Sequence, residues 1–468
     1  MSSSINYAIF NGYLDMSAQG AVAVTGLIEN TSLTNLNLGS NRLGADGTDS
    51  LAEALTLNSN LLSLNLWLNQ LGDAGASSLA LALTQNSSLS HLDLSCNRIG
   101  DEGASSLAGA LKHNSSLTCL NLGINQLGTS GAESLAEALT LNSSLASLDL
   151  GDNQLGDTGA SFFAHALTQN SSLSNLSLGL NRLGAISADS LAKAFIQNSS
   201  LLSLNLEGNQ LGDAGTSSLA LALAQNSSLT FLNLESNQLG DAGASSLALA
   251  LTQNSSLLSL NLKNNQLGDA GTTSVALALT QNTNLTNLNL ESNQFGDAGA
   301  TSLAGTLTLN SSLTRLNLRF NQLGASGAAS VAEALTQNPN LTHLDLGGDQ
   351  LGAEGASLLG RIQSLLDRNR HNKTARRLSL EALCARFFAK LVFESYSPEN
   401  KSAVYHHIWK HSAMPNELRF GERNVFTVDW SIFLRSVADA GLDLKKGVEL
   451  LLQHEGKSLR YARYVTTV

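Results

Sequence analysis

Leucines recur along most of this chain with a fixed period. The segment LTNLNLGSNRLG starts at Leu33, a matching segment starts at Leu61, and the series continues at the same interval up to Leu341, which gives twelve copies without an insertion or a deletion. In each copy the L-x-L alternation predicts a short β-strand with its leucines inward and the residue between them outward. Apolar residues at helical spacing, such as Leu79 and Leu83, predict a helix after each strand.

Polar residues at fixed places in the copy predict how each unit turns. An asparagine, such as Asn41 or Asn69, leaves each strand, and its amide can both donate and accept hydrogen bonds. Stacked copies therefore predict a ladder of buried asparagines, which ends at Asp349 because a carboxylate cannot donate. A recurrent aspartate is predicted to cap the N-terminus of the helix that follows it. These aspartates are Asp73, Asp101, Asp157, Asp213, Asp241, Asp269 and Asp297.

A single strand–helix unit is too small to bury its own apolar face. Stacking the units side by side buries a continuous core, so the repeat predicts a solenoid. The strands form a parallel sheet on one side and the helices form a row on the other. Because helices are wider than strands, we expect the array to curve with the sheet inside. The fold class is α/β, a curved solenoid with a parallel inner sheet and outer helices.

These copies resemble the leucine-rich repeat, in its 28-residue ribonuclease-inhibitor-like class. The resemblance covers about residues 5–360 and rests on twelve copies in phase. It implies a horseshoe whose concave sheet binds a protein partner. The near-uniform copies also resemble, more loosely, the leucine-rich-repeat effectors of intracellular bacteria such as Legionella, which implies an effector that acts inside a host cell.

The repeat pattern weakens at both ends, which predicts three regions. Residues 1–32 are expected to form a degenerate N-terminal capping repeat, since Ala8 stands one period before Leu36. Residues 33–356 hold the twelve repeats. Residues 357–468 carry amphipathic segments and predict a small α-helical C-terminal domain, with an apolar core that includes Trp409, Phe420, Phe426, Trp430 and Phe433. This domain either covers the open core of the last repeat or carries a second binding function.

Charge and composition exclude several classes of function. The 468 residues include 13% charged residues and three cysteines, and residues 1–352 hold 8 Lys and Arg against 25 Asp and Glu. This acidic body is expected to repel nucleic acid. No stretch reaches the roughly 18 apolar residues of a membrane span. The few cysteines and the start MSSSINYAIFNGYLD predict a cytoplasmic protein. The resemblance to bacterial effectors implies one delivered into a host cell without a cleaved signal peptide. A monomer is expected.

The outward strand positions are the expected binding site, because they are where the copies differ. An apolar cluster is predicted towards the N-terminus and a charged cluster with aromatic residues beyond it. The apolar cluster holds Trp67, Leu68, Ile124 and Leu180. The charged cluster holds Glu207, Phe231, Glu235, Lys263, Glu291, Arg315, Arg319 and Phe320. Exposed Trp, Arg and Phe are typical of binding hot spots. The alternative for the charged residues is that they pair with one another, which contributes about 0–1 kcal/mol per pair.

One outward column hardly varies and favours a structural role. It contains Asn, Asp or Ser in every copy, from Asn37 and Asn65 to Asp345. We predict that it forms a row of lateral hydrogen bonds between neighbouring strands.

No catalytic, cofactor or metal site is expected. Cys96 and Cys119 are predicted to be free thiols, and Cys384 a buried core residue. His407 and His411 share a helix face and could bind a metal, but an exposed helix face is favoured. The leading hypothesis is therefore a non-enzymatic scaffold that binds a protein on its concave face. The alternative is a substrate selector fused to a C-terminal catalytic or adaptor domain, for example of the ubiquitin pathway.

Overall fold

A computed structural model describes residues 7–9, 32–348, 351 and 357–374 of the chain. The chain divides into two compact units, Met1–Arg370 and His371–Val468. The described residues fall almost entirely in the first unit. Asp349, most of the predicted N-terminal capping repeat, and the segments that contain Cys384, His407 and His411 lie outside the described residues.

One parallel sheet runs through the whole first unit with its strands in chain order. Each strand is three residues long and pairs with the next in one constant register, so that Leu64 lies beside Leu36 and Leu92. The first strand keeps the same register, with Ala8 beside Leu36. The strands are β1 (Tyr7–Ile9), β2 (Asn35–Asn37), β3 (Ser63–Asn65), β4 (His91–Asp93), β5 (Cys119–Asn121), β6 (Ser147–Asp149), β7 (Asn175–Ser177), β8 (Ser203–Asn205), β9 (Phe231–Asn233), β10 (Ser259–Asn261), β11 (Asn287–Asn289), β12 (Arg315–Asn317) and β13 (His343–Asp345).

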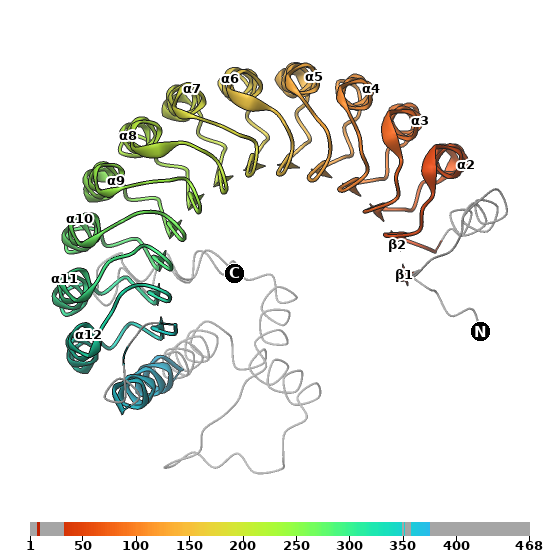
Figure 1. The fold of residues 1–468 in the computed structure, drawn as a ribbon. Helices are drawn as coiled ribbons and strands as arrows, with labels where there is room; N and C mark the ends of the chain where they lie inside the picture. Colours follow the sequence, from red (N-terminus) through yellow and green to blue (C-terminus); the bar gives the residue numbers. More distant parts are fainter. Residues whose placement is uncertain (1–6, 10–31, 349–350, 352–356, 375–468) are drawn as a thin grey trace, which may run out of the picture. The chain divides into compact units, whose positions relative to one another are not determined.

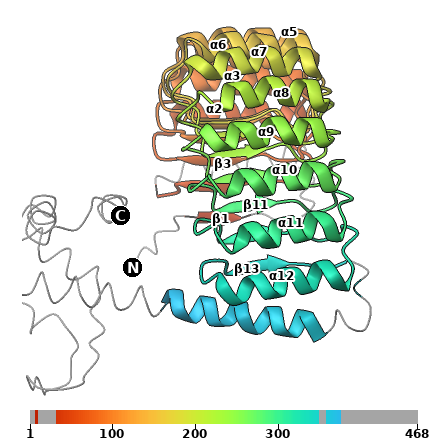
Figure 2. The same ribbon diagram turned by 90° about the vertical axis from the view of Figure 1, so that its left-hand side faces the viewer.

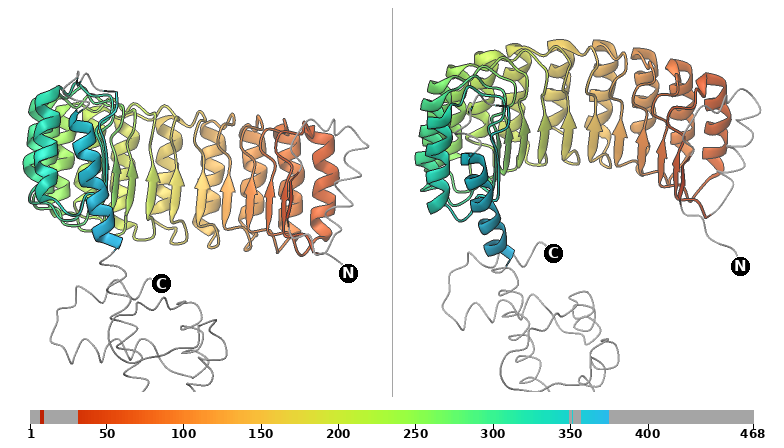
Figure 3. Two further views of the ribbon diagram at one scale, coloured as in Figure 1. Left: turned by 90° about the horizontal axis from the view of Figure 1, so that it is seen from below. Right: turned by 60° about the horizontal axis from the view of Figure 1, so that its bottom comes forward.

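A helix follows each strand from β2 to β12, and the helices form the outer layer of a curved array (Figure 1). Views from below show the same two layers, with the strands on the inner side of the curve (Figure 3). The predicted solenoid is confirmed. The helices are α2 (Gly44–Leu57), α3 (Gly72–Gln85), α4 (Asp101–Leu111), α5 (Thr129–Leu141), α6 (Gly156–Leu167), α7 (Ala185–Gln197), α8 (Gly212–Leu223), α9 (Asp241–Gln253), α10 (Asp269–Leu279), α11 (Asp297–Leu307) and α12 (Ala325–Gln337).

The core is a continuous stack of leucines and alanines between the two layers. Leu64 and Leu66 of one repeat are buried against the helix residues Ala76, Leu79 and Leu83. Alanine on the inner side of the helix lets the helix lie close to the strands. Each repeat therefore shares its core with both neighbours, as a solenoid requires.

The predicted ladder of asparagines is confirmed. The buried Asn97 donates from Nδ2 to the carbonyl oxygens of Leu66 (2.8 Å) and Leu94 (3.0 Å), and its Oδ1 accepts the N–H of Asn69 (2.8 Å). One bond stays within the repeat and the others cross to the preceding one. The amide thus fixes the turn after its own strand and the distance between repeats at once.

A second ladder lies at the C-terminal ends of the helices, where sequence analysis had not predicted one. Asn86 donates to the carbonyl oxygens of Leu55 (2.9 Å) and Asn58 (2.8 Å) of the preceding repeat, and its Oδ1 accepts the N–H of Leu89 (2.8 Å). Its counterparts in later copies make the same bonds, for example Asn310 to Leu279. Two rows of buried amides therefore tie the repeats together.

A further helix, residues 357–374, lies beside α12 at the end of the outer row (Figure 2). Ile362 and Leu366 are buried in the shared core. Asn369 donates to the carbonyl oxygens of Asn338 (2.9 Å) and Leu341 (2.8 Å), and so extends the second ladder by one step. The start of the predicted C-terminal region thus packs on the last repeat.

The prediction that the recurrent aspartates cap their own helices is wrong. Each lies in the first turn of its helix, and its Oδ1 accepts backbone N–H groups at the start of the next helix. Asp213, for example, accepts from Gly240 (2.7 Å) and Gly243 (2.8 Å). The capping is real but acts between repeats, because the neighbouring helix places its free N–H groups within reach of the carboxylate.

Two buried hydroxyl groups lead to a stability prediction. The Oγ1 atoms of Thr216 in α8 and Thr272 in α10 are buried without a hydrogen-bond partner, whereas other copies have a buried alanine there, such as Ala244. An unsatisfied buried hydroxyl costs about 1–3 kcal/mol. Thr216→Ala and Thr272→Ala should therefore each raise the free energy of unfolding by about 1 kcal/mol in urea titrations. Thr48→Ala is the control, since the Thr48 hydroxyl donates to Gly44 (2.6 Å) and should not give this gain. A lower urea midpoint for the first two variants would contradict the prediction.

Candidate functional site

The inner face of the sheet is built from stacked columns of outward-facing residues. Each repeat contributes the first and third residues of its strand and two residues of the following turn. For β3 these are Ser63, Asn65, Trp67 and Leu68. Because the register between strands is constant, equivalent residues of successive repeats lie side by side.

The nearly invariant column has a structural role, but its bonds run in a different direction from the one we expected. Its Asn and Asp side chains accept the backbone N–H two residues further on in the same repeat. Asn65 Oδ1 accepts from Trp67 (2.9 Å), and Asp149 Oδ1 from Gly151 (2.9 Å). Bonds across to the neighbouring repeat are added at some copies, such as Asn233 Nδ2 to Glu207 Oε2 (3.2 Å). The column mainly closes the turn after each strand.

The residue just before each ladder asparagine has a left-handed backbone conformation in all twelve copies. Its φ is 55° at Leu68, 56° at Ile124 and Leu180, and 53° at Phe320. This region costs most residues roughly 1–2 kcal/mol and is least costly for Gly and Asn. The other members of the column are Ser40, Cys96, Asp152, Gly208, Ser236, Asn264, Ser292 and Gly348. Sequence analysis missed this strain, although so many Gly, Asn, Asp and Ser residues in one column are a signal for it.

The four predicted apolar site residues lie exposed on the inner face. The exposed fractions are 41% for Trp67, 37% for Leu68, 53% for Ile124 and 51% for Leu180. Leu68, Ile124 and Leu180 belong to the left-handed column, which is the column of residues just before the ladder asparagines, and they stand in every second repeat. The structure thus places them in one row, with Cys96 and Asp152 between them, rather than in a single tight cluster.

Glycines make room for two of the exposed side chains. A side chain added at Gly208 would overlap Leu180, and one added at Gly348 would overlap Phe320. Each large side chain therefore lies across the glycine of the next repeat, which limits its freedom to move.

The predicted charged residues lie on neighbouring strands, and several pair with one another. Lys263 Nζ lies 3.3 Å from Glu235 Oε1 and 3.6 Å from Glu291 Oε1. Partial burial lowers the pKa of Lys263, but the negative charges of the two glutamates outweigh this effect and raise the pKa above its ordinary value. The glutamates also accept bonds from Asn261 and Asn317. For these three residues the structure therefore contains the pairing that we weighed as the alternative.

The remaining members of the charged cluster are arranged differently. Arg319 faces Asp345 on the next strand (Nε–Oδ2 3.7 Å) rather than Glu291, and its guanidinium lies over the Phe320 ring at 4.9 Å from the centroid. Arg315 and Phe231 are exposed at the first position of β12 and β9, three repeats apart. Arg319 and Phe320 are the only neighbouring pair in the described part of this cluster that joins a cation to an aromatic ring.

The two described cysteines are free thiols, as predicted. Burial raises the pKa of the Cys119 thiol; a hydrogen bond with Ser147 opposes this, and the charges of Asp93 and Asp149 add to it. A raised pKa makes the thiolate scarcer at neutral pH. Among the described residues no group of His, Cys, Asp and Glu has a geometry that could hold a metal ion.

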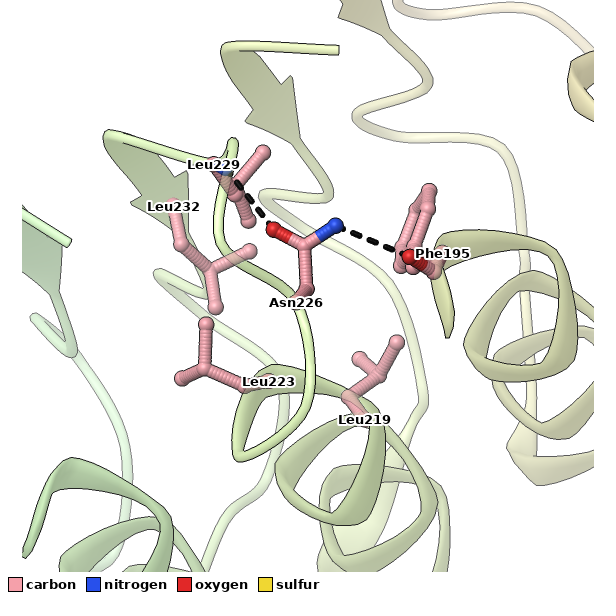
Figure 4. A pocket seen from close by; sticks show the side chains of 6 residues that line it. All are labelled: Phe195, Leu219, Leu223, Asn226, Leu229 and Leu232. Carbon is pink, nitrogen blue, oxygen red and sulfur yellow. Dashed lines mark hydrogen bonds between the residues drawn. The ribbon is translucent and has the colours of Figure 1, made fainter. Parts of the chain in front are cut away.

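A pocket in the core offers little for ligand chemistry (Figure 4). Leucines and Phe195 line it, and Asn226 is its one polar side chain. Asn226 Nδ2 donates to the Phe195 carbonyl oxygen (2.8 Å) and its Oδ1 accepts the Leu229 N–H (2.8 Å), so the amide is already used in the second ladder. Phe195 stands where most copies have leucine, and the pocket is a packing gap beside this larger ring.

The leucine-rich repeat family matches eleven segments that together cover more than half of the chain, and the chain belongs to this family. The matched segments are residues 29–52, 57–80, 85–108, 113–136, 141–164, 197–220, 225–248, 253–276, 281–304, 309–332 and 337–360. Leucine-rich-repeat proteins generally act as scaffolds for protein–protein interaction, and the fold is typically a binding scaffold rather than a catalytic one.

Comparison with solved structures gives similar chains. An internalin, InlF from Listeria monocytogenes, is 23% identical with a TM-score of 0.46, over 74% of this chain and 93% of that one. A chain of the Rad7 and Elc1 complex from yeast is 21% identical with a TM-score of 0.44, over 64% of this chain and 73% of that one. No curated protein matches the sequence. In the described part of the chain, no helix has the length and apolar character needed to span a bilayer.

Proposed function

We propose that the chain is a non-enzymatic scaffold that captures a partner protein on the inner, concave face of its sheet. One observation carries the proposal: Leu68, Ile124, Leu180 and Phe320 are exposed apolar residues held in a left-handed backbone conformation. Their apolar surface is in contact with water and their backbone is strained, and both are unfavourable. Asn or Gly at these positions would avoid both costs. A strained and exposed apolar side chain is explained when a partner covers it.

The inner face offers two anchors with different chemistry. Trp67 and Leu68 form the apolar one, and Arg319 stacked on Phe320 forms the second. Trp and Arg are among the residue types most enriched in binding hot spots. Glu235, Lys263 and Glu291 neutralise one another in part, and so they are expected to affect the rate and specificity of association more than its strength.

Affinity capture with matched variants tests the proposal. The triple variant Trp67→Ala, Arg319→Ala, Phe320→Ala should lower the amount of captured partner at least a hundredfold, because loss of two or three hot-spot side chains weakens binding by this order. All three side chains are partly exposed, so the thermal melt followed by circular dichroism should change little. The matched control removes Leu221, Leu249 and Leu277, which are exposed on the outer helices.

The two triple variants separate the faces of the array. Capture should survive the outer-face variant and fail with the inner-face variant. Equal capture by both, or loss only with the outer-face variant, would place the binding site elsewhere.

Several finer predictions rest on the sequence alone. The ribonuclease-inhibitor-like class, the bacterial effector role, the action inside a host cell and the monomeric state all stay predictions. The alternative function in a C-terminal catalytic or adaptor domain concerns residues outside the described part of the chain.

A further inference from the structure

Three exposed apolar side chains recur at a regular step along the inner face. Leu68, Ile124 and Leu180, named the apolar row from here on, lie two repeats apart in the left-handed column. The repeats between them carry Cys96 and the exposed Asp152. A partner that covers the whole row must present apolar groups with the same step.

Backbone hydrogen bonds set the length of this step. Each residue of the row donates its N–H to a carbonyl of the next repeat: Leu68 to Ser95 (3.0 Å), Ile124 to Gly151 (2.7 Å) and Leu180 to Glu207 (2.7 Å). The column therefore continues the ladder of the sheet, in which neighbouring strands are about 4.8 Å apart. Two repeats give about 10 Å, and the row spans about 20 Å.

This step matches an α-helix and does not match an extended strand. A helix advances about 1.5 Å per residue, so residues seven apart are separated by roughly 10.5 Å and lie on nearly the same face. A strand shows the same face every second residue, at about 6.6 Å, and every fourth, at about 13 Å. Three apolar residues spaced by seven would therefore meet all three members of the row along one helix.

The charges beside the row favour a basic helix. Asp152 lies between Ile124 and Leu180, and Asp93 and Asp149 stand at the third strand position of the repeats that carry Cys96 and Asp152. Lys or Arg beside the apolar residues of a bound helix would face these carboxylates and speed association.

We propose that the apolar row docks a basic amphipathic α-helix of the partner, which lies across the strands and carries an apolar residue at every seventh position. This inference rests on the proposed function and specifies its partner. Recognition of a helix by its apolar face is a recurrent binding mode, and the regular step of the row gives it a register here.

A display library of random 21-residue peptides tests the proposal. The library is selected on the full chain and counter-selected on the triple variant Leu68→Asn, Ile124→Asn, Leu180→Asn. Asparagine tolerates the left-handed conformation, so this variant should fold and melt no lower than the native chain. Enriched peptides should carry large apolar residues seven apart with Lys or Arg beside them, and the triple variant should bind them at least a hundredfold more weakly.

A one-residue insertion then distinguishes a helix from other bound shapes. One alanine added between the second and third apolar residues of the best peptide rotates the last of them by about 100° on a helix. Fluorescence anisotropy should show at least a tenfold loss of affinity. Selection of proline-containing or otherwise extended sequences, unchanged affinity after the insertion, or failure to enrich any peptide that needs the row would each overturn the proposal. The inner face would still be the binding site in those cases if capture is lost with the Trp67, Arg319 and Phe320 variant.

Discussion

Asn97→Ala should lower the free energy of unfolding of the repeat array by about 3 kcal/mol, since the buried Asn69 N–H loses its acceptor and two buried carbonyl oxygens each lose one of two donors. Asn97 is buried, and its Oδ1 accepts the Asn69 N–H (2.8 Å). Its Nδ2 donates to the carbonyl oxygens of Leu66 and Leu94, which also accept from Asn69 Nδ2 (3.0 Å) and Asn125 Nδ2 (3.0 Å). Each buried group left without a partner costs about 1–3 kcal/mol. Loss of the side chain also weakens the contact between two repeats, and the stability of a solenoid depends on such contacts.

Urea unfolding followed by circular dichroism measures this effect, and amide hydrogen exchange locates it. Protection should fall most in the repeats around Asn97. The control is Asn175→Ala, because Asn175 is exposed on β7 and donates only to the neighbouring Ser174 hydroxyl (2.9 Å). Its urea midpoint should stay near the native value. Similar midpoints for the two variants would show that the ladder contributes little.

The ladder could be predicted from the sequence because its cause is local and repeated. A single amide that donates and accepts at the same place in every copy has few other roles. The same holds for the leucine core, whose spacing encodes both strand and helix. The curved array follows from these two features, since every repeat has the same neighbours.

Contacts that cross between repeats were harder to foresee. The sequence pattern predicts that Asp213 caps its own helix, because that helix is its neighbour along the chain, whereas its partners Gly240 and Gly243 belong to the next repeat. The second ladder was missed for the same reason. The apolar site residues were correctly expected to be exposed, but the strain at Ile124 depends on backbone dihedral angles. Only the column of Gly, Asn, Asp and Ser residues around it could have indicated that strain.

The aspartate between repeats also controls the conformation of the next loop. Where the preceding repeat has this aspartate, the following glycine is extended, as at Gly240 (φ −101°). Where the preceding repeat has Ala185 or Thr129 instead, the glycine is left-handed, as at Gly212 (φ 57°) and Gly156 (φ 62°). A carboxylate that binds the glycine N–H therefore selects one of two loop conformations.

Asp213→Ala should accordingly cost about 2 kcal/mol, because two N–H groups at the start of α9 lose a charged acceptor. The reverse change should stabilise the fold. At the start of α8 the Gly212 and Gly215 N–H groups donate to the carbonyl oxygens of Asn237 (3.0 Å) and Leu211 (3.0 Å). Ala185→Asp offers them a charged acceptor instead and is expected to add about 1 kcal/mol. Ile186→Asp is the control. Ile186 is exposed in the same first turn of α7, so this substitution adds the same charge to the same helix. Urea titrations should rank Ala185→Asp above the native chain and above this control. If both aspartates gave the same gain, the benefit would come from the dipole of α7 alone, and a bond to the next repeat would not be needed to explain it.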